Sequence, residues 1–88
     1  MATYRIEFAA SAHRQFAKLA PDAKRRLAPE IDMLATEPRP HGAKRLATED
    51  ELYRIRVGVY RIVYAVENDL LVILVVKIGH RRDVYRGL

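Results

Sequence analysis

Cysteine is absent from this sequence, which excludes disulfide cross-links and metal sites built on thiolates. Histidine is scarce as well: His13, His41 and His80 lie far apart and on different predicted elements. A bound metal ion needs clustered histidines or carboxylates. We therefore expect the protein to hold no metal ion and to need no cofactor.

Other familiar chemistries lack their residues too. The single serine, Ser11, is placed to cap a helix, so a serine or cysteine nucleophile is not expected. The sequence contains no glycine-rich phosphate loop. Its longest apolar run, Leu70 to Val76, is far shorter than the roughly 20 residues that cross a bilayer. The segment from Met1 to Glu7 lacks the apolar core of a signal peptide, so we expect a cytoplasmic protein.

The residues that are present suit one small packed core. The chain has 88 residues, of which 50% are hydrophobic, and we expect a single domain over residues 1–88. Its formal net charge is +5, which on so small a domain attracts nucleic acid or an acidic protein segment. Charge alone does not choose between these two partners.

The first half of the chain predicts one strand and two helices. Apolar and polar residues alternate from Thr3 to Phe8, which is the period of a half-buried strand. Ser11 suits the N-cap of a short helix that ends before Pro21, and Pro21 suits the first turn of a second helix. An interior proline costs a helix on the order of 3 kcal/mol. Because the apolar stripe of the second helix keeps its phase across Pro29, we expect a kink there rather than an end.

A loop rich in turn-forming residues follows the helices. It runs from Glu37 to Gly42 and leads into two basic residues, Lys44 and Arg45. The acidic run from Glu49 to Glu51 is typical of a solvated loop and matches no metal motif.

The second half of the chain predicts three antiparallel strands. Their expected ranges are 52–57, 60–66 and 70–78, separated by turns at 58–59 and 67–69. The run from Leu70 to Val76 is apolar on both alternating faces, so we expect a central strand covered on both sides, with the helices on one. The fold class is therefore α+β: one N-terminal strand and two helices packed on an antiparallel sheet that a three-strand C-terminal meander completes.

The predicted hairpin gathers arginines. Glycine at the first position of the two-residue turn Gly58-Val59 favours type II′, which sets Arg56 opposite Arg61. Arg54 then shares a face with both, and two arginines in direct opposition repel each other. A polyanion across this face would turn repulsion into attraction, since a guanidinium donates two parallel hydrogen bonds to a phosphate. The alternative is that these arginines are the solvent side of an ordinary hairpin.

The tail after the last predicted strand carries groups suited to acid-base chemistry. His80 changes charge near neutral pH, Arg81 stabilises a developing negative charge, and Tyr85 exchanges a phenolic proton where neighbouring cations lower its pKa. The alternatives are an ordinary surface histidine and a tyrosine that serves as a packing anchor.

Two segments carry a resemblance to a known family. The hairpin Tyr53 to Tyr64 and the tail Ile78 to Arg86 resemble the signature segments of RelE-type toxins of bacterial type II toxin-antitoxin pairs. The order of elements and the length also fit, so the resemblance spans nearly the whole chain and implies a RelE-like fold. It further implies a ribosome-dependent endoribonuclease, in which a ribose 2′-hydroxyl attacks the adjacent phosphate of messenger RNA in the ribosomal A site.

The resemblance also implies roles for individual residues. Some relatives have lysines where this chain has Arg54 and Arg56, and arginine is an implausible general base because it does not deprotonate in proteins. We therefore favour Tyr85 as the base and keep His80 as its competitor. The predicted catalytic residues are Arg61, Arg81, Tyr85 and His80, and the predicted RNA-binding residues are Arg54, Arg56, Lys44, Arg45 and Arg82.

Two other functions fit the same pattern. ParE-type toxins share the fold but poison DNA gyrase, and they need no RNA-cutting residues. Arg61, Arg81 and Tyr85 together favour the nuclease. The basic face could also serve chiefly to bind a RelB-like antitoxin, which the resemblance implies as a partner and which is compatible with RNA cleavage.

Overall fold

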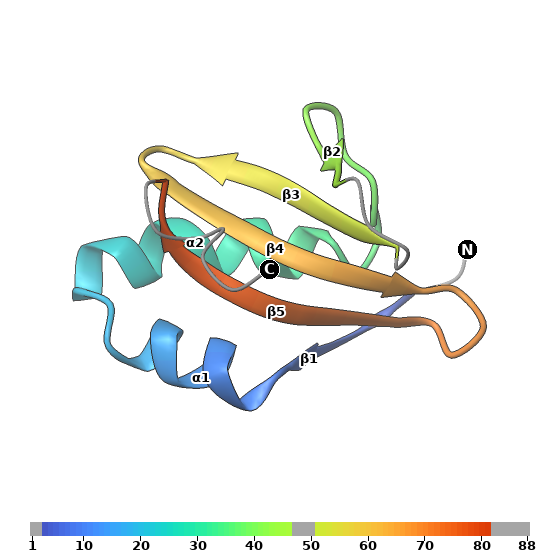
Figure 1. Cartoon of the computed structure of the whole chain (residues 1–88), viewed down its shortest axis with the longest axis horizontal. Helices are drawn as coiled ribbons and strands as arrows, with labels where there is room; N and C mark the ends of the chain where they lie inside the picture. The colour runs from blue at the N-terminus through green and yellow to red at the C-terminus, as the bar shows by residue number, and fades with distance from the viewer. Residues whose placement is uncertain (1–2, 47–50, 82–88) are drawn as a thin grey trace.

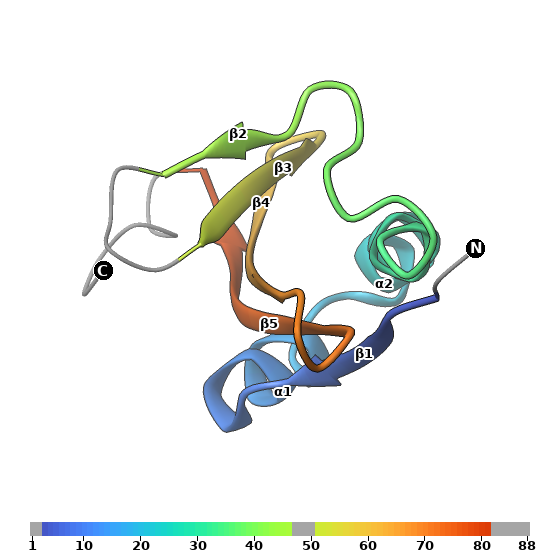
Figure 2. The same ribbon diagram turned by 90° about the vertical axis from the view of Figure 1, so that its right-hand side faces the viewer.

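A computed structural model describes residues 3–46 and 51–81 of the chain. In this part a five-stranded sheet in the order β1-β5-β4-β3-β2 carries both helices on one face (Figure 1; Figure 2). The elements, in chain order, are β1 (Arg5–Phe8), α1 (Ala10–Ala17), α2 (Pro21–Met33), β2 (Lys44–Arg45), β3 (Leu52–Val57), β4 (Tyr60–Glu67) and β5 (Val72–His80). The α+β class is confirmed, as are the C-terminal meander and the two helices.

The sheet is mixed rather than antiparallel throughout. β1 runs parallel to β5, with Arg5 opposite Val72, whereas the pairs β2/β3, β3/β4 and β4/β5 are antiparallel. A parallel pair needs a long crossover connection, and here the helices and the meander together provide it. The expectation of a purely antiparallel sheet is therefore wrong for β1, and the two-residue strand β2 is an addition to the predicted elements.

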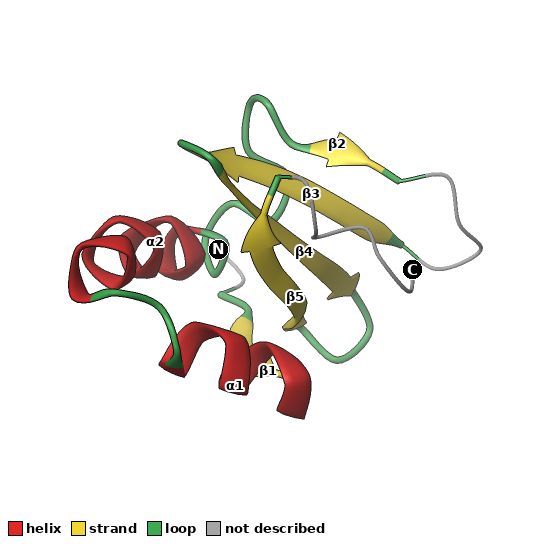
Figure 3. Cartoon of the chain, turned by 60° about the vertical axis from the view of Figure 1, so that its left-hand side comes forward, coloured by secondary structure: helices red, strands yellow, loops and turns green. Residues whose placement is uncertain are grey.

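The helix boundaries differ from expectation at one end. Ala9 precedes α1 without a side-chain cap, so Ser11 lies inside the first turn and its prediction as N-cap is wrong. The cause is sheet pairing, because the Ala9 N–H still donates to the Val75 carbonyl at 2.8 Å and the helix begins directly after it. α2 begins at Pro21 as predicted and continues past Pro29 to Met33 (Figure 3).

The core lies between the helices and the sheet. Tyr64 of β4 is its largest fully buried side chain, and its ring stacks on Tyr53 with 5.9 Å between the centroids. Phe8 and Phe16 pack against the same cluster from β1 and α1, 6.0 Å apart. The central residues of this core are Ala12, Leu27, Ile31, Leu34, Ile62, Ile73, Val75 and Ile78.

The turn between β4 and β5 falls later than expected. β4 extends to Glu67, and the turn covers residues 68–71, so Leu70 and Leu71 are not the start of the central strand. Both leucines are exposed, and Leu71 has a positive φ of 53°. β5 then continues to His80 instead of ending at Ile78. The predicted central strand is confirmed in β5, which lies between β1 and β4 and has Val72, Ile73 and Val75 buried. Neither described helix is long and apolar enough to span a membrane.

Candidate functional site

The β3/β4 hairpin has the register that the sequence predicts. Arg56 pairs with Arg61 and Arg54 pairs with Val63. Gly58 has a φ of +62°, whereas Val59 has no positive φ, which fits a type II′ turn. Because directly paired residues lie on the same face of an antiparallel sheet, the three arginines project from one face and the tyrosines of the core from the other.

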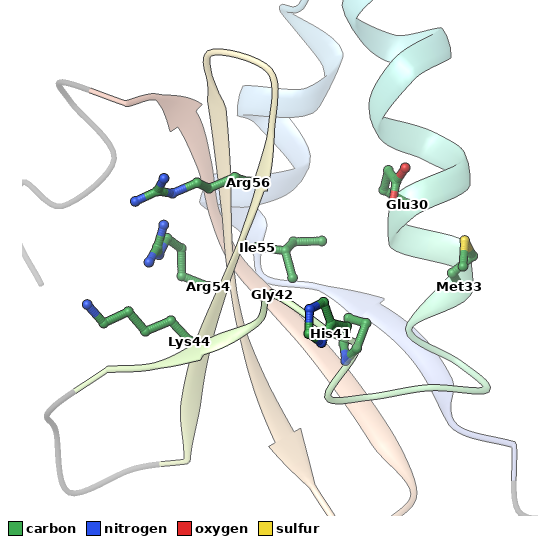
Figure 4. Close-up of a pocket in the computed structure, with 9 residues that line it drawn as sticks. Glu30, Met33, His41, Gly42, Lys44, Arg54, Ile55 and Arg56 are labelled. Atoms are coloured by element: carbon green, nitrogen blue, oxygen red, sulfur yellow. The ribbon is translucent and has the colours of Figure 1, made fainter.

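Two lysines extend this cationic surface. Lys44 of β2 pairs with Arg54, and Lys77 of β5 pairs with Val63, so both share the face of the arginines. Figure 4 shows the side chains of Lys44, Arg54 and Arg56 in a row that points away from α2. We call Lys44, Arg54, Arg56, Arg61 and Lys77 together the arginine face. Lys77 was not among the predicted residues, although it precedes the core residue Ile78 and neighbouring strand residues point to opposite faces.

Arg54 lies buried within this face. Its exposed fraction is only 7%, and its Nε has no hydrogen-bond partner among the residues that the structure describes. A buried cation with an unsatisfied donor is costly unless an anion neutralises it. The structure thus holds a buried guanidinium at the centre of the arginine face, and guanidinium groups form strong charge-assisted hydrogen bonds with anions.

Arg61 is held at the tip of the hairpin. Its Nη1 donates to the carbonyl oxygens of Tyr60 at 3.0 Å and Gly58 at 3.3 Å. The N–H of Arg81 donates to the Val59 carbonyl at 2.8 Å, so the chain after β5 stays beside the same turn. Arg61 and Arg81, predicted to act together, are therefore anchored to the same two-residue turn.

Not all predicted residues join this face. His80 pairs with Tyr60 and Arg45 pairs with Tyr53, so the register places both on the opposite, helix-bearing side of the sheet. His80 is exposed at the very end of β5. Tyr85 and Arg82 lie outside the described residues.

A hollow of about 430 Å³ lies beside the arginine face, between α2 and the β2/β3 edge. Ile55 points toward α2 across it, while Glu30 and Met33 face it from the helix (Figure 4). Pro40, His41 and Gly42 of the loop also line it. Lys44, Arg54 and Arg56 contribute to its lining from the sheet side, so the hollow and the arginine face share a rim.

A polar network centred on Arg39 pins the loop that leads into β2. Arg39 donates to the Tyr53 hydroxyl at 2.8 Å and to Glu51 at 3.0 Å, and its guanidinium lies 5.2 Å from the Tyr53 ring centroid. The hydrogen bond to Tyr53 raises the pKa of Arg39. The hydroxyl of Tyr64 donates to the Pro38 carbonyl at 2.6 Å, and burial raises the pKa of this phenol. No sequence pattern indicates this network, which holds the loop against the sheet just before Lys44 pairs with Arg54.

The chemistry available on the arginine face is that of phosphate binding. Guanidinium groups stay charged at physiological pH and stabilise negative charge that develops on a phosphate oxygen. Within residues 3–46 and 51–81, no group of three or more histidine, aspartate or glutamate residues is arranged to hold a metal ion.

Comparison with known proteins places this geometry in context. The family model described as the ParE toxin of type II toxin-antitoxin systems, parDE, matches residues 6–85. A protein of Methanocaldococcus jannaschii that is provisionally named toxin RelE1 is 32% identical over 89 residues, which cover 93% of this chain and 99% of that protein.

Two solved complexes have the same fold. The toxin-antitoxin complex RelBE2 of Mycobacterium tuberculosis contains a chain that superposes with a TM-score of 0.80 at 26% identity, covering 94% of this chain and 97% of that one. The RelE-RelB complex of Pyrococcus horikoshii gives a TM-score of 0.77 at 28% identity, with 93% and 99% covered.

Proposed function

Since the chain belongs to the RelE/ParE superfamily of type II toxin-antitoxin toxins, we propose that it is an endoribonuclease that cuts messenger RNA in the ribosomal A site and so inhibits translation. The observation that carries this proposal is the arginine face, and above all the buried Arg54 with its unsatisfied Nε. A buried guanidinium with an unsatisfied donor favours an anionic ligand. RNA supplies such anions at regular spacing.

The proposed reaction is a transesterification within the RNA. The 2′-oxygen of one ribose attacks the adjacent phosphorus, the bond to the 5′-oxygen breaks, and the products are a 2′,3′-cyclic phosphate and a 5′-hydroxyl. A general base takes the 2′-hydroxyl proton, and a general acid protonates the leaving 5′-oxygen. Arg61 and Arg81 hold the reacting phosphate and stabilise its added negative charge, a role that requires no metal.

The remaining residues have supporting roles in this proposal. Arg54 and Arg56, with Lys44, hold the phosphates that flank the cut, and Lys77 extends that surface. Tyr85 remains the proposed base and Arg82 a proposed RNA contact. The pairing of His80 with Tyr60 weakens the case for His80 as the competing base, because it sets His80 on the other side of the sheet from Arg61.

We further propose a RelB-like antitoxin as the protein partner. The similar toxins of M. tuberculosis and P. horikoshii were solved in complex with antitoxins. An acidic or amphipathic antitoxin segment would occupy the arginine face and block RNA.

The decisive experiment is primer extension on a defined message translated in a purified system. We expect discrete, ribosome-dependent cuts from the wild type, cuts that persist in EDTA-treated toxin, and none from Arg61→Ala. Arg25→Ala is a matched control, because Arg25 pairs with Asp22 on the exposed side of α2 and should cut as the wild type does. The ParE family match gives the alternative: intact message together with trapped gyrase-DNA complexes would replace the nuclease by a gyrase poison.

A further inference from the structure

Arg26 of α2 lies against the tip of the β3/β4 hairpin. A Cβ atom on Gly58 would stand only 2.7 Å from Arg26 Nη2, 3.2 Å from its Cζ and 3.4 Å from its Nη1. The guanidinium thus occupies the space that a side chain at position 58 would fill. Glycine at this position serves both the positive φ of the turn and the approach of Arg26.

The Arg26 side chain is exposed and makes no hydrogen bond or ion pair with the described part of the chain. Its neighbour Arg25 pairs with Asp22, and Arg39 pairs with Glu51. Arg26 therefore differs from these arginines, because it approaches a basic surface instead of an acidic partner.

The other side of the same turn carries Arg61. Arg61 donates to the Gly58 carbonyl, and Arg56 is its direct partner across the hairpin. The two-residue turn thus has cations on both sides: Arg56 and Arg61 from the arginine face, and Arg26 from the helix side.

We propose that Arg26 is a phosphate-contacting residue and that an RNA strand bound on the arginine face continues over the Gly58-Val59 turn to reach it. A chain of regularly spaced phosphates fits cations distributed along a path, whereas a single acidic side chain neutralises only one of them. Val59, 46% exposed at the tip, offers an apolar surface to the sugar or base between successive phosphates. This inference rests on the proposed function, since it extends the RNA path beyond the residues proposed for cleavage.

The test measures binding without cleavage. A short fluorescein-labelled RNA with 2′-O-methyl groups cannot supply the attacking hydroxyl, so its anisotropy reports affinity alone across a range of salt concentrations. We expect Arg26→Gln to weaken binding roughly tenfold at low salt and to lower the slope of log K against log salt by about 0.7, the value for one lost single-strand phosphate contact. Arg26→Lys should restore the slope because it keeps the charge.

Arg25→Gln is the matched control, since it removes the same charge from the next residue of the same helix. Equal effects of Arg26→Gln and Arg25→Gln would overturn the inference, as would a wild type that does not bind the RNA. Loss of antitoxin affinity with unchanged RNA affinity would also overturn it, because Arg26 would then contact the protein partner.

The inference and the proposed function fail separately. If Arg26→Gln has no specific effect while Arg61→Ala abolishes ribosome-dependent cleavage, only the extended RNA path is wrong. If Arg26→Gln lowers the salt slope and the wild type cuts no message, the Arg26 phosphate contact is supported and the proposed nuclease activity is wrong.

Discussion

Arg56 and Arg61 are directly opposite each other in the β3/β4 hairpin, and no acidic residue separates them in the register. Such a pair of like charges is expected to destabilise the fold by several tenths of a kcal/mol. The pair also lies beside the buried Arg54, so this cluster of positive charges favours ligand binding at the expense of fold stability.

The first prediction concerns this pair. Arg56→Gln should raise the free energy of unfolding by a few tenths of a kcal/mol in low salt, because it relieves the repulsion from Arg61. The gain should shrink at high salt, where charges are screened. Urea unfolding at two salt concentrations measures it. A loss of stability in both buffers would mean that Arg56 is held by favourable contacts.

The second prediction concerns Arg54. Arg54→Met keeps most of the side-chain volume and removes a buried charge with an unsatisfied Nε, so the free energy of unfolding should rise by about 1 kcal/mol. Affinity for RNA should fall in the same variant. Urea unfolding and anisotropy of the non-cleavable RNA measure the two effects. A variant that is less stable than the wild type would contradict the view of Arg54 as a site that awaits an anion.

The third prediction concerns the buried phenol of Tyr64. Burial raises its pKa, so the folded protein keeps this proton at a pH where the unfolded chain has lost it. The unfolded state then binds fewer protons, and stability should fall as the pH rises above the ordinary tyrosine value of 10.0, by at most about 1.4 kcal/mol per pH unit. Below that value the phenol is neutral in both states and contributes no slope.

Tyr64→Phe tests this pH dependence. The variant should lose about 1 kcal/mol near neutral pH, because the bond to the Pro38 carbonyl is gone, yet it should lose stability less steeply at about pH 11. Tyr4→Phe, which removes a phenol hydroxyl from an exposed bond to Asn68, is the control for the loss of a hydroxyl. Equal alkaline slopes in wild type and Tyr64→Phe would refute the prediction.

The fourth prediction separates two roles of glycine. Gly58→Ala and Gly42→Ala should each destabilise the fold by about 1 kcal/mol, since both glycines have a positive φ. Only Gly58→Ala should also weaken RNA binding, because its Cβ displaces Arg26, whereas a Cβ on Gly42 has nothing within 4 Å. Adding Arg26→Gln to Gly58→Ala should then cause little further loss of affinity. Fully additive losses would show that the two residues act independently.

Local rules account for what the sequence predicted well. A two-residue loop with glycine in first place leaves one hairpin register, and that register alone brings Arg54, Arg56 and Arg61 to one face. The same strand alternation predicts that Lys77 lies on this face, because its neighbour Ile78 points into the core.

The features that were missed depend on long-range contacts. Nothing near Arg5 reveals that β1 will pair with β5 in parallel. Strand β2, at two residues, is too short for any periodic pattern. The apolar character of Leu70 and Leu71 predicts a strand, but the turn at 68–71 keeps both residues exposed. The bond between Arg39 and Tyr53 joins a loop to a strand and leaves no local signal.

The parallel pairing of β1 with β5 also sets the point in synthesis at which the sheet can be completed. Arg5 leaves the ribosome 67 residues before Val72, so β1 has no sheet partner while the residues between them are made. Contacts between such distant segments slow folding, because loop closure must precede them. A nascent chain therefore emerges without a complete sheet, which leaves an interval in which the proposed antitoxin can meet the chain before the sheet forms.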